Sequence, residues 1–548
     1  MAALITALDT VTNIQCGENG HIEYAWNKVQ QENILQIFFQ LVRTSNDVTL
    51  ENIATKYQEC FDQSSIDEKK ILIKILAHTR DIEEGKGEYA LTFAILKKMM
   101  IRNDKLCIAL MKNFVGEEND KPMGSWKDMK YFFNTIKDVP EPLIKVMNEQ
   151  LEKDLDKMKK KESCSLLAKW IPREKSKKFG WINEILAKDY FANYGSSEKG
   201  WTISAINKAK THYRKLVSSI NKYLDTVQIK QCGHIWSKID FNNVTSITMM
   251  KQKQAFLNIK EVKTKDREQC RENLLNFLEE VKAGNKEIKG KRTSMIDFIK
   301  NALNVENNDE RFIINEAWKN NSKQTKSLEN MIAMVDTSGS MECENCQPLY
   351  SAMGLGLRVA EKSKLGKRIM TFHNKPTWIK LDECVDFVDE VEKVRCAGWG
   401  FNTNFHEAMD LILEQIVKNK IPAADIENLV LVVFSDMQFD KAEPHNSNNY
   451  NETVRQILER KFYDAGIKIC GQGYKLPHIL FWNLQSTNGF PELSYQPNVT
   501  MLSGYSPMLL NTFIEKGMNG IKDITPWTML LQILDKERYN KLEKLINE

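Results

Sequence analysis

Residues 331–346 read "MIAMVDTSGSMECENC", and this stretch decides the fold class of the second half of the chain. Five apolar-leaning residues lead directly into Asp336, and small hydroxyl residues follow it. An apolar run that stops at Asp-Thr-Ser-Gly-Ser is typical of a buried strand whose carboxyl end offers oxygen ligands. We therefore expect residues 331–336 to form a central strand of a parallel sheet.

Four more apolar runs of the same character follow this stretch, at 367–373, 429–436, 478–484 and 499–504. Amphipathic segments with helical periodicity separate them. Strands that alternate with helices in this way predict a doubly wound, Rossmann-like α/β domain with a mostly parallel sheet. We place this domain at residues 326–520 and a C-terminal helix at 521–548.

The first half of the chain has a different pattern, with apolar residues at helical spacing throughout residues 22–320. Examples are "ENILQIFFQLV" (32–42) and "DEKKILIKILAHTRDI" (67–82). Many short amphipathic helices in series predict a HEAT-like helical-repeat array, although no strict sequence period is present. After an N-terminal tail at 1–20, this array occupies residues 21–325, so the fold class is multidomain α + α/β.

The composition of the 548-residue chain is that of an ordinary globular protein, with 42% hydrophobic and 27% charged residues. No apolar run is long enough to span a membrane, and the start lacks the basic and apolar regions of a signal peptide. Eleven scattered cysteines suit a reducing compartment. We expect a monomeric cytoplasmic protein without membrane contact; frequent Lys, Asn and Ile also fit a viral source, for which host cytoplasm or virion is expected.

The net charge of +4 is unevenly distributed. Residues 1–150 hold 18 Lys and Arg against 22 Asp and Glu, residues 151–300 hold 32 against 18, and the remainder holds 27 against 33. A basic middle section indicates a polyanionic partner, and solvated lysine-rich helices are the alternative explanation.

Oxygen-bearing side chains follow two of the predicted strands, and another precedes a predicted helix. The carboxyl ends of parallel strands meet at one edge of a sheet, so these side chains should converge. The predicted set is Asp336, Ser338 and Ser340 from the first loop, Thr403 from the second and Asp436 from the third. Two carboxylates and three hydroxyls suit Mg²⁺ or Mn²⁺, with an open position for an acidic residue of a partner protein.

No residue in these loops forms an obvious catalytic arrangement. Ser338 and Ser340 have no neighbouring histidine, so a Ser-His-Asp hydrolase is not indicated. Cys343 and Cys346 form a C-x-x-C pair without a second pair at zinc-binding spacing. We interpret them as ordinary loop thiols, with a redox pair as the alternative, and we expect no enzymatic activity.

The three loops in this order resemble the von Willebrand factor A family and its metal-ion-dependent adhesion site. A helical array that precedes such a domain resembles the Ro ribonucleoprotein family, whose TROVE module is a ring of helical repeats. A closer resemblance is to an uncharacterised TROVE-related family of plants and large DNA viruses. The stretches that resemble the TROVE module are "HTRDIEEGKGE" (78–88), "GSWKDM" (124–129), "AKWIPRE" (168–174) and "THYRKLVSSINKYLD" (211–225). The closer family shares the RDI and GKGE of the first stretch, the YRKL of the last and the W-x-x-ID of 236–240.

The Ro resemblance implies a ribonucleoprotein component that binds structured or misfolded non-coding RNA, or free single-stranded ends. Cations and aromatics of the basic array are the candidate contacts. They are Arg80, Lys86, Lys159, Lys160, Arg173, Lys177, Lys178, His212, Tyr213, Arg214 and Lys215. The competing hypothesis is a metal-dependent adaptor without RNA binding. Positive charge on one continuous face would favour the RNA-binding hypothesis, and charge scattered over all helices would favour the adaptor hypothesis.

Overall fold

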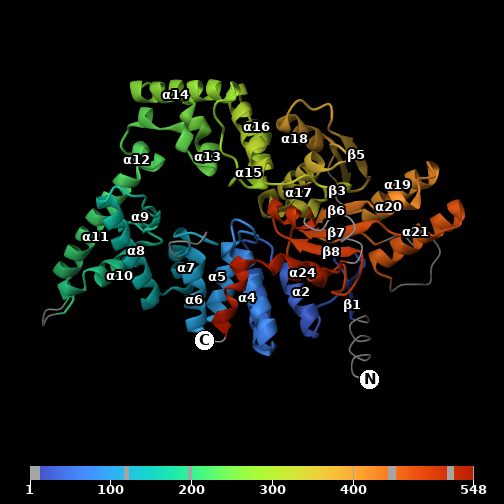
Figure 1. The fold of residues 1–548 in the computed structure, drawn as a ribbon, viewed down its shortest axis with the longest axis horizontal. Coiled ribbons are helices and arrows are strands. Elements are labelled where there is room, and N and C mark those ends of the chain that lie inside the picture. Colours follow the sequence, from blue (N-terminus) through green and yellow to red (C-terminus); the bar gives the residue numbers. More distant parts are fainter. Residues whose placement is uncertain are drawn as a thin grey trace.

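The computed structural model describes residues 13–116, 122–195, 200–398, 400, 402–441, 452–514 and 524–546. A mostly helical region is followed by a mixed, mostly parallel sheet, so the predicted α + α/β class is confirmed (Figure 1). The first twelve residues of the predicted tail lie outside the described ranges. Among the described helices, none has both the length and the apolar character needed to cross a membrane.

The sheet has six strands in the order β5-β4-β3-β6-β7-β8, so strands are added on both sides of β3. All neighbours are parallel except β5, which pairs antiparallel with β4 at one edge. β6 and β7 are buried along their whole length, which explains their continuous apolar sequence. The strands are β3 (Met331–Asp336), β4 (Arg368–Phe372), β5 (Thr377–Lys380), β6 (Val430–Ser435), β7 (His478–Asn483) and β8 (Val499–Ser503).

Helices connect these strands, and one of them, α17, also contacts the helical region. A Cβ atom at Gly356 would come within 2.5 Å of Val335 on β3, and one at Gly354 within 2.8 Å of the Met295 side chain. The two glycines therefore allow α17 to lie close to a strand and to a neighbouring helix at once. The connecting helices are α17 (Cys343–Lys362), α18 (Phe387–Cys396), α19 (Phe405–Lys418), α20 (Ala423–Glu427), α21 (Val454–Cys470) and α22 (Asn511–Ile514).

The helices before the sheet follow an arc that leaves the α/β part at α2 and α4 and returns to it at α15 and α16 (Figure 1). A short hairpin, β1 (Ile14–Cys16) and β2 (Ile22–Tyr24), precedes the arc. The helices of the arc are α2 (Gln30–Gln40), α3 (Asp47–Gln63), α4 (Ile66–Arg80), α5 (Tyr89–Met99), α6 (Asp104–Val115), α7 (Lys127–Ile136), α8 (Glu141–Lys159), α9 (Leu167–Trp170), α10 (Gly180–Tyr190), α11 (Ile203–Leu224), α12 (Val227–Cys232), α13 (Ser246–Phe256), α14 (Lys265–Lys282), α15 (Met295–Leu303) and α16 (Asn308–Ser322).

Both ends of the arc dock on the α/β part. At the first end, the side chain of Gln40 accepts a hydrogen bond from the backbone of Thr487 (2.7 Å) and donates one to Gly489. At the second end, Trp318 of α16 stacks on Phe387 of α18, with ring centroids 4.0 Å apart. The helical region therefore begins and ends on the same domain.

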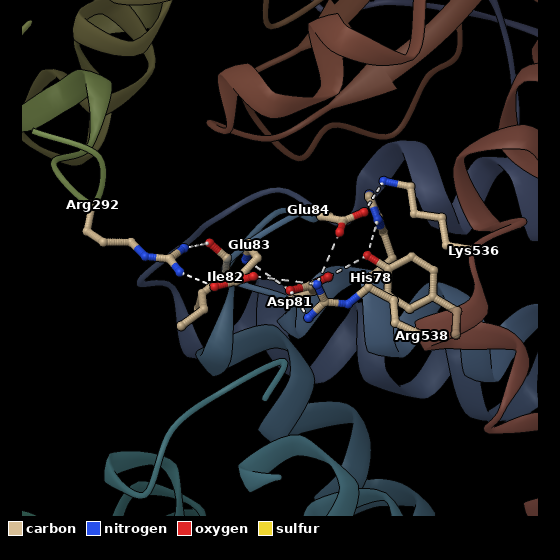
Figure 2. A network of polar contacts seen from close by, with 9 residues as sticks. His78, Asp81, Ile82, Glu83, Glu84, Arg292, Lys536 and Arg538 are labelled. Carbon is tan, nitrogen blue, oxygen red and sulfur yellow. Dashed lines mark hydrogen bonds and ion pairs between the residues drawn. The ribbon is translucent and has the colours of Figure 1, made fainter. Parts of the chain in front are cut away.

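The two ends of the arc also contact each other through the turn at residues 81–84. Arg292, just before α15, donates a hydrogen bond to the backbone oxygen of Ile82 (2.7 Å) and pairs with Glu83 (Figure 2). Arg538 pairs with Asp81 at 3.0 Å from the other side of the same turn. This turn thus joins both ends of the arc and the C-terminal segment.

The segment that the sequence assigns to a single C-terminal helix, 521–548, contains three short elements in its described part, 524–546. They are α24 (Pro526–Leu534), α25 (Glu537–Asn540) and η6 (Glu543–Ile546). Tyr539 is buried and donates a hydrogen bond to Asp81 (2.7 Å). The segment therefore packs against the start of the arc.

Candidate functional site

Asp336 ends β3 with its carboxylate fully buried at the carboxyl edge of the sheet. One carboxylate oxygen accepts a hydrogen bond from the backbone of Ser338 (2.9 Å). The other accepts one from the hydroxyl of Ser435, the last residue of β6 (2.5 Å). The carboxylate is thus fixed between the ends of two adjacent strands.

Asp436 follows β6 and is also buried at this edge. Its carboxylate accepts hydrogen bonds from the backbone of Gln438 (3.1 Å) and from the side chain of Ser340. The hydroxyl of Ser340, in turn, lies 3.1 Å from that of Ser338. Four of the five predicted metal ligands therefore lie together.

The fifth, Thr403, is buried in the second loop, which is tied to both of the others. The backbone of Gly400 donates to Thr337 (3.3 Å), and Gly400 forms a parallel bridge with Ser338. The backbone of Thr403 donates to the carboxylate of Asp440 (2.9 Å) in the third loop. The structure brings all three predicted loops to one edge of the sheet.

The electrostatics of this edge favour a bound cation. Burial, and after it the nearby negative charge of Asp436, raises the pKa of Asp336 from 3.8 to about 7. Burial also raises the pKa of Asp436. Among the described residues, no Lys, Arg or His forms an ion pair with either carboxylate. A divalent cation would supply the missing positive charge.

The donor set decides which cation could fit. Within the described ranges, no group of three or more His, Cys, Asp and Glu side chains could hold a metal ion. An ion at this edge would therefore depend on two carboxylates, hydroxyls and water, which is the ligand chemistry of Mg²⁺ or Mn²⁺. The thiol of Cys343 lies nearby, but burial raises its pKa to about 11, so it is not a ready thiolate.

The N-terminal hairpin is a neighbour of this edge that the sequence did not indicate. The backbone of Glu18 donates to the side chain of Gln438 (2.7 Å), and Gly20 forms an antiparallel bridge with Asp440. Residues 13–20, which the sequence assigns to a tail, therefore lie against the third loop. No local sequence signal could have indicated this packing, because the partners are about 420 residues apart.

Three of the predicted RNA contacts are buried and have structural partners instead. Arg80 donates two hydrogen bonds to the carboxylate of Asp128, at 2.8 and 2.5 Å. The ammonium group of Lys86 donates to the backbone of Phe38 (2.6 Å) and to two further oxygens. The hydroxyl of Tyr213 donates to Asn148 (3.0 Å). These side chains present no surface to RNA.

The other predicted contacts lie at the surface of the arc. Lys159 pairs with Asp156 (2.9 Å), Arg214 pairs with Glu174 (3.1 Å), and half-buried His212 lies 2.6 Å from the hydroxyl of Tyr194. The remaining five are exposed, and within the described part of the chain they form no ion pair: Lys160, Arg173, Lys177, Lys178 and Lys215.

A group of lysines that was not predicted from the sequence lies over aromatic rings in the same region. Lys127 and Lys130 of α7 and Lys169 of α9 all face the ring of Trp170. The alternation of cations and aromatics in "WKDMKYFF" (126–133) and "AKW" (168–170) is the signal that could have found them.

Comparison with known sequences shows that two parts of the chain match families of unknown function. Residues 330–544 match a domain of unknown function, DUF7788, and residues 142–341 match another, DUF2828. The uncharacterized protein L728 of Acanthamoeba polyphaga mimivirus is 26% identical over 553 residues, which cover 96% of this chain and 88% of that protein.

These matches correct the resemblances drawn from the sequence. The α/β part matches DUF7788 and not the von Willebrand factor A family, and residues 142–341, which include the second half of the arc, match DUF2828 and not the Ro or TROVE-related families. The misleading signals were short. An Asp-x-Ser-x-Ser at a strand end and a few Gly, Trp and Lys positions are too short to identify a family without a match over the whole domain. The candidate sites therefore rest on geometry alone.

Proposed function

We propose that this protein binds RNA through the cationic surface of its helical arc and does not act as an enzyme. In this proposal the arc is a HEAT-like stack of helices, and the edge of the sheet is a separate Mg²⁺ or Mn²⁺ site for an acidic residue of a partner protein. The narrower expectation of misfolded non-coding RNA came from the Ro resemblance and is dropped with it.

The observation that carries the RNA proposal is the set of exposed cations without ion-pair partners between the end of α8 and the middle of α11. Lys160, Arg173, Lys177 and Lys215 are exposed, and in the described part of the chain no carboxylate pairs with them. Charges that are left unpaired on one stretch of an arc favour a polyanion. The adaptor alternative gives these cations no role.

The metal proposal is supported by the two buried carboxylates of Asp336 and Asp436, which have hydroxyl neighbours and no cationic side chain as a partner among the described residues. A bound Mg²⁺ would neutralise them and would retain open positions filled by water or by a carboxylate from another protein. Among the described residues, none beside it is poised as a nucleophile, which supports a binding role.

The test is the salt dependence of RNA binding by the full chain. A variant with Lys160, Arg173, Lys177 and Lys215 changed to Gln should bind single-stranded RNA more weakly at low salt. Its plot of log affinity against log salt should be flatter, by about 0.7 per lost phosphate contact. The matched control changes four exposed lysines of the α/β part: Lys380, Lys418, Lys420 and Lys468. Equal slopes for the two variants would contradict the proposal.

A further inference from the structure

A cluster of lysines and aromatic rings covers the surface formed by α7, α9 and the start of α10. We call it the lysine–aromatic surface. Its members are Lys127, Lys130, Tyr131, Lys169, Trp170, Lys178 and Phe179. None of these side chains is fully buried.

Lys130 lies at the centre of this surface. Its ammonium nitrogen is 4.8 Å from the ring centroid of Trp170, 5.5 Å from that of Phe179 and 5.6 Å from that of Tyr131. Lys127 lies 5.2 Å from the ring of Tyr131 and 5.5 Å from that of Trp170. Two lysines thus share the same rings, whereas an ordinary cation–π contact joins one cation and one ring.

The rings themselves form a connected group. Those of Tyr131 and Phe179 meet edge to face with centroids 5.3 Å apart. Tyr89, at the start of α5, lies 5.4 Å from Tyr131 and is 45% exposed. The group therefore extends from the lysines to an exposed aromatic side chain on the neighbouring helix.

The charge of this surface is not neutralised within the described structure. No described carboxylate forms an ion pair with Lys127, Lys130, Lys169 or Lys178, and the adjacent Asp128 is already engaged by Arg80. Burial lowers the pKa of Lys130, and the charge of Lys127 lowers it further. Burial lowers the pKa of Lys127, the adjacent Asp128 offsets this in part, and the exposed Lys251 of α13 lowers it again, so the charge of Lys251 adds to the same field.

We propose that the lysine–aromatic surface is the place where RNA is held by its unpaired nucleotides, an inference that rests on the proposed RNA-binding function. The flexible lysine side chains would turn toward the phosphates and uncover the rings of Trp170, Tyr131 and Phe179. Bases that are not paired could then stack on these rings. The surface combines the two contacts that single-stranded RNA needs, positive charge along the backbone and aromatic faces for the bases.

Double-stranded RNA fits this surface poorly, because its bases are stacked on each other and offer no free face. An acidic peptide would use the lysines but would gain nothing from the three rings. The aromatic component therefore distinguishes unpaired nucleotides from other polyanions, and the experiment is designed around it.

The experiment measures binding of the full chain to a fluorescent 12-nucleotide single-stranded RNA, to a 12-base-pair RNA duplex and to polyglutamate. Trp170→Leu should weaken single-strand binding about tenfold, which is the size of one lost stacking contact. Binding to the duplex should change by less than about twofold. Trp378→Leu, at an exposed tryptophan on β5, is the control and should change the binding of neither RNA.

A second variant keeps the test independent of the packing of Trp170. Lys127→Gln with Lys130→Gln retains the side-chain stems and should flatten the salt dependence of single-strand binding by about 1.4 in slope. Its control is Lys69→Gln with Lys300→Gln, two lysines that each lie over a single ring elsewhere.

The outcomes separate this inference from the proposed function. If the wild type binds no RNA, the proposed function and this inference are both wrong. If it binds RNA and neither variant differs from its control, RNA binding stands and the lysine–aromatic surface is not the site. If polyglutamate binds as tightly as the single strand and Trp170→Leu weakens neither, the surface is a general anion patch and the inference is overturned.

Discussion

Arg292 donates a hydrogen bond of 2.7 Å to the backbone oxygen of Ile82, which lies 210 residues earlier in the chain (Figure 2). Both residues sit where the helical arc meets the α/β part: Ile82 after α4 and Arg292 before α15. Because Arg292 also pairs with Glu83, one side chain joins the two ends of the arc.

Replacing Arg292 with Met should loosen this junction. The side chain is 45% exposed, so we expect a small loss, about 1 kcal/mol of stability. The clearer effect should be faster hydrogen exchange of the backbone amides at residues 81–88. Arg271→Met, at an exposed arginine without an ion-pair partner in the described chain, should leave that exchange unchanged. Unaltered exchange in both variants would mean that the two ends are held together by other contacts.

Substitutions in the ion pair of Arg80 and Asp128 test whether Arg80 stabilises the fold or contacts RNA. Both side chains of the pair are about 5% exposed, so removal of either leaves a buried charge unpaired. Asp128→Ala and Arg80→Ala should each destabilise the fold by about 3–5 kcal/mol, measured by urea unfolding. Replacement of both by apolar residues should recover much of this loss. If only Arg80→Ala weakened RNA binding in a folded protein, Arg80 would contact RNA directly.

The metal site predicts a stability increase on adding Mg²⁺. Without a cation, the buried carboxylates of Asp336 and Asp436 repel each other, and a bound ion stabilises the folded state by mass action. The thermal midpoint of the wild type should rise with Mg²⁺ or Mn²⁺ concentration, and Asp336→Ala should abolish the rise. Asp382→Asn, at a half-exposed surface carboxylate of the same domain, is the control and should keep it. A thermal midpoint of the wild type that does not change with either ion would argue against a metal site.

Glu492 predicts a pH dependence that is separate from the metal site. Burial raises its pKa from 4.5 to about 8, and Arg455, 3.7 Å away, offsets this only in part. Between these two values the unfolded chain releases a proton that the folded protein retains. The contribution of Glu492 to stability is therefore largest below pH 4.5 and falls as pH rises toward 8, by at most about 1.4 kcal/mol per pH unit.

Glu492→Gln should remove this dependence, so the variant gains stability relative to the wild type between pH 5 and pH 8. Thermal midpoints at pH 5, 6.5 and 8 measure it. Glu414→Gln, at an exposed carboxylate of α19, should track the wild type. Parallel curves for Glu492→Gln and the wild type would mean that the buried carboxyl titrates normally.

The sequence predicted the parts of this structure that depend on local pattern. The apolar runs coincide with β3, β4, β6, β7 and β8, because buried parallel strands need continuous apolar residues. The loops after β3 and β6 followed from strand direction, whereas the loop of Thr403 was expected there because it precedes a helix beside them. The short edge strand β5 was missed, since "TWIK" has no pattern that distinguishes it from a loop.

The long-range contacts could not be predicted in this way. Lys86 and Arg80 look like surface cations in the sequence, yet each is buried by partners 45 to 417 residues away. Tyr213 follows a histidine in a basic stretch but faces the core at helical spacing. The periodicity that predicts a helix does not reveal which charged residue its neighbours will enclose.

In the proposed function, RNA binds to the helical arc and not to the α/β part. The decisive measurement is ultraviolet crosslinking of the full chain to a uridine 12-mer, followed by mass spectrometry of the attached peptides. We expect crosslinks within residues 127–215, with Tyr131, Trp170 or Phe179 among the modified side chains. Crosslinks confined to residues 331–510 would contradict it.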